Sequence, residues 1–293
     1  MQGPRGRESL AILRGSEDLT GKAKALNTLG SILIEQGKYD EAQGYYEECL
    51  RLYRATGLKS GESIVLANLG NILYGRGEYA LACTYYNECL ETRRLLGDKQ
   101  GIAAALDYLA RAVREQGNYQ RACDLHTESL AMRRALNDKP GIAFALNHLA
   151  IVKIHLDELS EVRLLLNESL QYWQEIGDKT GLAEALTQWG EVCQREGETT
   201  AARVNWLESL HISREAGDRS SIAGLLESCA SLAVSEAQLC DAAQMLGLAD
   251  AIRADISNPI RPSLRSRMTG RLPKYRRRWA RNVFSRHGLK DAP

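Results

Sequence analysis

The side chains of this 293-residue chain that could take part in catalysis or metal binding fall into a few small groups. His148 and His155 lie seven residues apart, which places them on roughly one face of a helix, with Asp157 and Glu158 close by. Imidazole and carboxylate groups are metal ligands. Two histidines on a helix face without a third fixed ligand are nevertheless more typical of a recognition surface. We therefore predict no metal site and no cofactor.

Nucleotide and thiol chemistry find no better support. The segment nearest to a phosphate loop, Gly15 to Ala23, has one residue too many between its glycines and lacks the hydroxyl that would hold magnesium. The seven cysteines include no C-x-x-C pair, and Cys49 and Cys89 are spaced by 40 residues, which is typical of small buried hydrophobes in a repeat. We predict a protein that is not an enzyme.

A repeat of 40 residues accounts for most of these positions, and a fixed period of this size indicates stacked helix pairs. Two kinds of helix break recur. The first is a glycine that ends the first helix of a pair, at Gly37, Gly77, Gly117 and Gly197. The second is a Gly-Asp or Asn-Asp step, in which Gly or Asn closes the second helix and Asp caps the next first helix, at Asp98, Asp138, Asp178 and Asp218.

These columns resemble the tetratricopeptide repeat in its form of about 40 residues per unit. Its small-residue signature falls on Gly30, Gly70, Ala110, Ala150, Gly190 and Ala230, and on Ala42, Tyr46 and Cys49 with their equivalents. The resemblance implies an all-α fold, a right-handed α-solenoid of stacked antiparallel helix pairs (TPR superhelix). The expected units are 21–60, 61–100, 101–140, 141–180, 181–220 and a partial 221–250, flanked by a partial repeat or cap helix at 1–20 and by a Pro-containing loop and basic tail at 251–293.

A second resemblance covers residues 241–253, an alanine-rich stretch followed by Pro259 and Pro262. It is similar to the segment that closes the repeat region of bacterial LuxR-type regulators and STAND signalling ATPases. In those proteins the array is a sensor arm that relays binding of an effector or partner. This chain departs from their pattern by continuing into an arginine-rich segment. The resemblance implies a role in bacterial signalling or transcriptional regulation.

The tetratricopeptide family binds partners on a concave surface lined by first-helix positions that are not used in packing. Asparagine amides suit the backbone of an extended peptide, and Arg111 and Arg114 suit an acidic group. The family's carboxylate clamp is not reproduced, because Ala104 and Tyr108 stand where basic residues are expected. We predict a protein-protein interaction scaffold or sensor arm for a peptide or protein ligand, with the groove formed by Lys24, Asn27, Ser31, Asn68, Asn71, Tyr74, Asp107, Tyr108, Arg111, Arg114, Asn147, His148, His155, Glu184, Gln188, Glu191 and Arg195.

Charge is distributed unevenly along the chain. Residues 261–293 hold eleven Lys or Arg and one acid, so their net charge is +10 while the rest carries −9 and the whole only +1. Such a tail suits nucleic acid, an acidic membrane surface or the chain's own acidic repeats. The alternative function is therefore a nucleic-acid-associated regulator that binds through the tail while the repeats recruit a partner, with candidate contacts at Arg271, Lys274, Arg276, Arg277, Arg278 and Arg281.

The remaining expectations concern location and assembly. No apolar run reaches the roughly 18 residues that a membrane span needs, and charges throughout the first 20 residues argue against a secretory signal. We expect a cytoplasmic protein that does not bind membranes. Open solenoid ends expose apolar surface, so self-association through those ends is also expected.

Overall fold

The computed structural model describes residues 18 to 256, and every regular element in that range is an α-helix. The predicted all-α solenoid of helix pairs is confirmed. The last helix extends beyond residue 250, where the partial sixth unit was expected to end. The helices are α2 (Leu19–Glu35), α3 (Tyr39–Thr56), α4 (Lys59–Gly75), α5 (Tyr79–Leu96), α6 (Lys99–Glu115), α7 (Tyr119–Ala135), α8 (Lys139–His155), α9 (Leu159–Ile176), α10 (Lys179–Arg195), α11 (Thr199–Ala216), α12 (Arg219–Ser235) and α13 (Leu239–Asp255).

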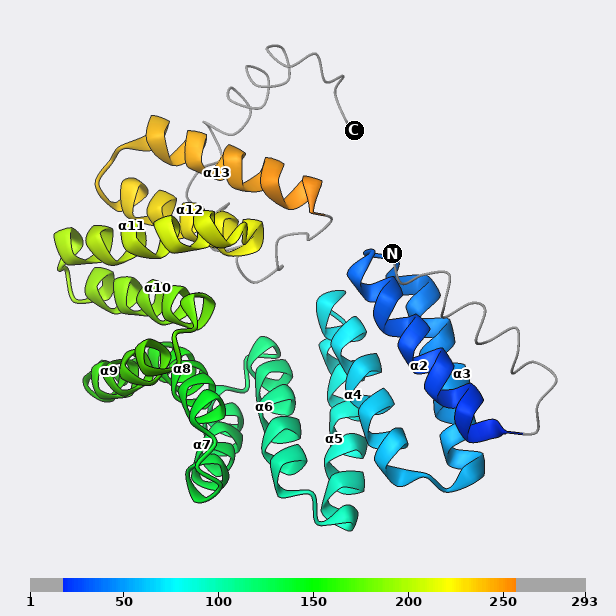
Figure 1. Ribbon diagram of the computed structural model, residues 1–293. Coiled ribbons are helices and arrows are strands. Elements are labelled where there is room, and N and C mark those ends of the chain that lie inside the picture. Colours follow the sequence, from blue (N-terminus) through cyan, green and yellow to red (C-terminus); the bar gives the residue numbers. More distant parts are fainter. Residues whose placement is uncertain (1–17, 257–293) are drawn as a thin grey trace, which may run out of the picture. The chain divides into compact units, whose positions relative to one another are not determined.

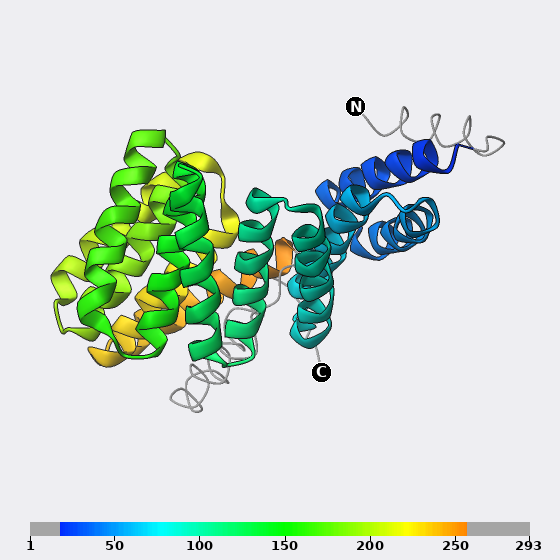
Figure 2. The ribbon, with the colours of Figure 1, turned by 90° about the horizontal axis from the view of Figure 1, so that it is seen from below.

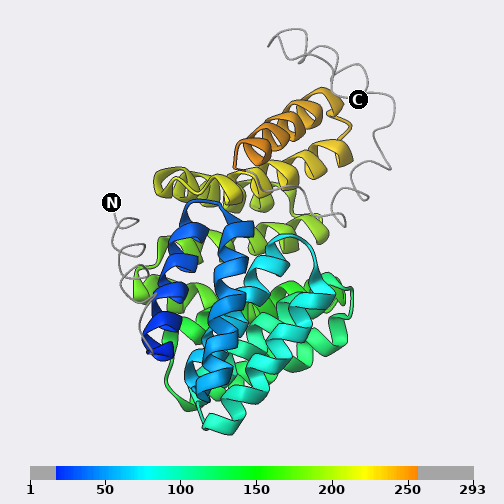
Figure 3. The same ribbon diagram turned by 90° about the vertical axis from the view of Figure 1, so that its right-hand side faces the viewer.

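The chain divides into two compact units, residues 1–158 and 159–293. In the first unit α2 to α8 pack in chain order, each on the next (Figures 1 and 2), and α6 also contacts α4 and α8. The even-numbered helices, which open each pair, therefore share one side of this unit, called here the first-helix face. In the second unit α10 packs between α9 and α11. A further pair is formed by α12 and α13, which are yellow and orange in Figure 3. None of the described helices combines the length and apolar content needed to cross a membrane.

The predicted helix breaks are confirmed by the backbone. Gly37 and Gly97 adopt the left-handed conformation with φ of 74° and 65°, which glycine takes without the steric cost of a Cβ. Asn137 and Asp157 take the glycine's place with φ of 54° and 64°. The Asp98 carboxylate accepts from the Gly101 backbone N–H at 2.9 Å and so caps α6.

Each pair is held by a small residue on the first helix that faces a large one on the second. A Cβ added to Gly30 would lie 2.6 Å from the Tyr46 ring, and one added to Gly190 would lie 2.3 Å from Trp206 Nε1. Where alanine replaces this glycine, at Ala110 and Ala150, the residue at the position equivalent to Tyr46 is His126 or Leu166, which is smaller than tyrosine or tryptophan. The bulk of the second helix therefore decides which small residue the first helix can carry.

A second column ties the helices of a pair through one short side chain. Cys49 Sγ donates to the Ala23 carbonyl at 3.0 Å, and the Ser209 hydroxyl donates to the Ala183 carbonyl at 2.7 Å. Cys89 and Ser129 do the same in the second and third pairs. Cys49 and Cys89 are buried, and their position needs a small side chain with one donor. This is consistent with cysteine in the first two pairs and serine in the next three.

Candidate partner-binding surface

Polar side chains of α2 and α4 connect neighbouring pairs on the first-helix face. Asn68 Nδ2 donates to Asn27 Oδ1 at 3.3 Å, and both residues are half-buried. Asn71 is exposed, and its Oδ1 accepts from the Tyr86 hydroxyl at 2.8 Å. Ser31 makes the equivalent contact with the hydroxyl of Tyr46, whereas Lys24 is exposed. The predicted residues of these two helices thus line one continuous polar strip.

The strip continues onto α6 as an aromatic and cationic cluster. The Arg111 guanidinium lies over the Tyr74 ring, 4.8 Å from its centroid, and the rings of Tyr86 and Tyr108 stack at 5.6 Å. Arg114 is 8% exposed and donates through Nη2 to Glu115 Oε1 at 2.8 Å. Among the described residues, Arg111 Nε and Arg114 Nη1 are buried without a hydrogen-bond partner. Both nitrogens are therefore enclosed by protein atoms and lack a hydrogen bond within the described range.

Glu115 is the contact residue that the sequence projection missed. Its Oε1 accepts from the Tyr74 hydroxyl at 3.4 Å as well as from Arg114, so it joins α4 to the arginine on α6. The repeat could have indicated this residue, because Glu115 occupies the same position of its repeat as His155 and Arg195, which are both predicted groove residues.

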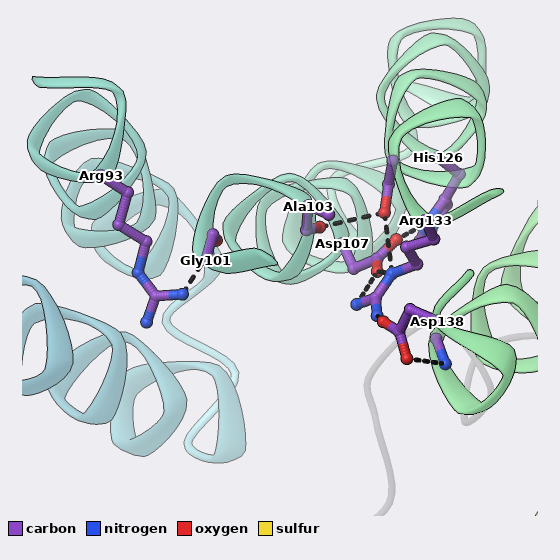
Figure 4. Close-up of polar contacts among 9 residues, drawn as sticks. Arg93, Gly101, Ala103, Asp107, His126, Arg133 and Asp138 are labelled. Atoms are coloured by element: carbon purple, nitrogen blue, oxygen red, sulfur yellow. Dashed lines mark hydrogen bonds and ion pairs between the residues drawn. The ribbon is translucent and has the colours of Figure 1, made fainter. Parts of the chain in front are cut away.

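Asp107 lies in the interior, where its carboxylate is 1% exposed (Figure 4). Arg133 on α7 donates to Asp107 Oδ2 through Nη2 at 2.7 Å and through Nε at 3.0 Å, and His126 Nδ1 lies 3.0 Å from Oδ1. Arg133 Nη1 also donates to Asp138 Oδ2 at 2.6 Å, while Asp138 Oδ1 caps α8 by accepting from the Gly141 N–H. Asp107 therefore organises three helices, and its oxygens are engaged within the protein.

The histidines of this region lie in two separate settings. His126 is fully buried, and burial lowers the pKa of its imidazole below the usual value, although the hydrogen bond with Asp107 opposes this. Its ring stacks on His148 at 5.7 Å. His155 instead stacks on Tyr119 at 4.6 Å. Within residues 18–256 no group of three or more His, Cys, Asp or Glu is arranged to hold a metal ion.

Asn147, next to His148 on α8, is 2% exposed, so it lies in the packed interior and not on an open face. Its Oδ1 has no hydrogen-bond partner among the described residues. Asn147 Oδ1 is thus a buried acceptor without a partner, whereas Arg111 Nε and Arg114 Nη1 on α6 are buried donors without one.

The second unit contributes the α10 residues of the predicted set. Glu184 and Arg195 are exposed, Gln188 and Glu191 are half-buried, and Arg195 Nη2 donates to Glu191 Oε1 at 3.0 Å. The predicted tail contacts lie outside the described residues: Arg271, Lys274, Arg276, Arg277, Arg278 and Arg281.

A family model for the tetratricopeptide repeat matches residues 5–55, 62–135 and 105–175. No curated protein sequence matches the chain. Solved structures are similar: RapI in its apo form (14% identity, 87% of this chain and 92% of that chain, TM-score 0.76) and a Rap protein complexed with competence and sporulation factor (17%, 87% and 70%, 0.69). A third is the Rap conjugation gene regulator of plasmid pLS20 in complex with a Phr peptide (14%, 92% and 69%, 0.70). At such low identity these likenesses establish the fold alone.

Proposed function

The chain belongs to the tetratricopeptide repeat family, and we propose that it is a non-catalytic scaffold or sensor arm that binds a peptide, or an extended segment of a protein, on the first-helix face of its first unit. The observation that carries the proposal is the cluster of Tyr74, Arg111 and Arg114. It offers a stacked guanidinium and two buried N–H donors without a partner among the described residues. Buried donors of this kind gain most when a ligand carbonyl or carboxylate reaches them.

The neighbouring amides suit the rest of an extended ligand. Asn27, Asn68 and Asn71 lie half-buried or exposed on α2 and α4, and each amide offers both donors and an acceptor to a peptide backbone. One of the similar structures is a Rap regulator in complex with the Phr* peptide, and another is a Rap protein complexed with competence and sporulation factor. Their fold is shared with this chain, which supports a peptide as the ligand class.

The setting we propose is bacterial signalling or transcriptional regulation, in the cytoplasm. The similarity to Rap regulators supports it, and so does the resemblance of residues 241–253 to the segment that closes the repeat region of LuxR-type and STAND regulators. On this interpretation ligand binding to the repeats is the input signal, and a partner protein receives it.

Binding by the full chain to a displayed library of random peptides tests the proposal. Arg111→Gln and Arg114→Gln are each expected to weaken the best binder by about tenfold, because each removes a charge-assisted hydrogen bond. Arg94→Gln is the matched control, since Arg94 is an exposed arginine of α5 that pairs with Glu91. Thermal unfolding of each variant checks that folding is intact. The proposal is wrong if no peptide binds, or if both variants bind as tightly as the control.

A further inference from the structure

Acidic charge is concentrated in the second unit. Residues 18–158 carry seventeen basic and eighteen acidic side chains, so they are nearly neutral. Residues 159–256 carry seven basic and sixteen acidic side chains, and residues 257–293, which follow directly, carry eleven basic and one acidic. The strongest opposite charges of the molecule thus lie next to each other in the chain, and proximity raises their mutual attraction.

The second unit also exposes apolar side chains on its odd-numbered helices. Leu164 on α9 is 71% exposed, and Val204 and Leu207 on α11 are 58% and 65% exposed. Leu164 and Val204 occupy equivalent positions 40 residues apart, and Leu207 lies one turn beyond Val204 on the same face of α11. We call Val204 and Leu207, which share this face of α11, the outer apolar patch. Its side chains gain stability if another apolar group covers them.

An acidic group borders this patch. Glu208 lies four residues after Val204, which places it on the same face of α11. Glu208 is exposed and forms no ion pair with another described residue. Glu215, about two turns further along α11, already pairs with Lys179 at 3.0 Å. The carboxylate nearest to Val204 and Leu207 therefore remains available to a cation.

We propose that residues 271–281 of this same chain bind the outer apolar patch. This segment combines six Lys or Arg with Tyr275 and Trp279. The two aromatic residues supply apolar surface for Val204 and Leu207, and a flanking cation meets Glu208. No other stretch of the sequence offers both the charge and the aromatic content that this surface requires.

The connection from Ile256 to Arg271 can exceed the length of one helix of the array. Fourteen residues separate Ile256 from Arg271, and such a segment spans up to about 45 Å. An 18-residue helix such as α11 is only about 27 Å long. Tethering also holds the segment at an effective concentration on the order of millimolar, so a contact that would be weak between separate molecules suffices. Docking neutralises the acidic unit and withholds the basic segment from external anions.

Zero-length carbodiimide cross-linking of the full chain, read by mass spectrometry, tests the inference. Lys274 is expected to join Glu208 in the monomer, with a yield that does not depend on protein concentration. Val204→Ser with Leu207→Ser is expected to lower the yield by about tenfold, the effect of losing roughly one leucine-sized contact. Leu81→Ser with Leu95→Ser is the matched control, because both residues are exposed in the first unit, and it should leave the yield unchanged.

Several outcomes contradict the inference. Cross-links from Lys274 spread evenly over carboxylates of both units, or a yield that the patch variant leaves intact, exclude this docking site. Cross-links found only in a dimer assign the patch to the segment of a second copy. Tight binding of a single-stranded oligonucleotide with no Lys274 cross-link assigns the segment to nucleic acid. The peptide variants Arg111→Gln and Arg114→Gln should not change the yield, so this inference and the proposed function fail independently.

Discussion

Two helix pairs of this protein, α6 with α7 and α10 with α11, have the same backbone plan around different interiors. In the first pair the buried centre is ionic, with Asp107 bound by Arg133 and His126. In the second the equivalent centre contains Trp206, whose Nε1 donates to the Thr187 carbonyl at 3.1 Å. The same interior position is thus filled by a network of charged side chains in one pair and by an indole ring in the other.

The positions at which the two pairs agree show what the repeat requires. Leu106 and Leu186, like Ala122 and Ala202, are buried equivalents. The serine that donates to a first-helix carbonyl is also present in both. These residues set the spacing of the helices. The centre between them tolerates very different chemistry.

The largest expected effect comes from removing one member of the ionic centre. Arg133→Met leaves the Asp107 carboxylate buried without its cation and should lower the free energy of unfolding by about 3–5 kcal/mol, as measured by urea denaturation. Ser213→Ala at the equivalent position of the other pair should change it by less than about 0.5 kcal/mol. The Ser213 hydroxyl is buried without a partner among the described residues, so its loss costs little.

The double variant Asp107→Leu with Arg133→Met is the control for the first change. Because it removes both charges, it should recover much of the lost stability. Equal losses in the single and double variants would show that the cost arises from packing and not from the unpaired carboxylate.

An intermediate effect is expected at the aromatic centre. In Gly190→Ala the new Cβ meets Trp206 Nε1 at 2.3 Å, which should cost about 1–3 kcal/mol of unfolding free energy by overpacking. Gly224→Ala is the control, since a Cβ there has no heavy atom within 4 Å. In a Trp206→Leu background, which copies the Ala150 and Leu166 combination, Gly190→Ala should cost at least about 1 kcal/mol less. Additive costs would refute the size matching.

The smallest effect is a pH dependence confined to the ionic centre. Burial lowers the pKa of His126 below 6.5, with Arg111 and Arg114 adding to the effect and Asp107 opposing it. The unfolded chain takes up this proton near pH 6.5 but the folded chain does not. Stability is therefore complete above that pH and falls below it, by up to about 1.4 kcal/mol per pH unit. Urea denaturation at pH 7.5 and 5.5 should show a shallower dependence for His126→Leu, and an unchanged slope would contradict this account.

The sequence predicted the fold well because residues that end and cap helices recur at a fixed spacing of 40. Gly37 and its equivalents indicated left-handed turns, and the aspartates between successive helix pairs indicated N-caps. Both follow from local backbone chemistry. Gly30 and Tyr46 each belong to a column that repeats every 40 residues, but the contact between them could not be inferred from the sequence.

The surface was harder to predict, because burial depends on residues that are distant in sequence. Asp107 has the spacing of a groove residue, but Arg133, 26 residues later, holds it in the interior. No neighbouring residue in the sequence distinguishes Asp107 from Asn68. Asn68 is half-buried, and it lies one position after the residue that is equivalent to Asp107 in its own repeat. Glu115 was missed for the same reason, since its importance comes from Tyr74 on another helix.

The column of short donors gives the first two pairs built-in reporters of local opening. Cys49 and Cys89 are thiols in that column, whereas the third and fifth pairs use serine. Burial raises the pKa of Cys49 to about 12, so its reactive thiolate forms almost exclusively when the pair separates. The rate at which a thiol reagent modifies Cys49 and Cys89 therefore measures how often each of these pairs opens, without any added label.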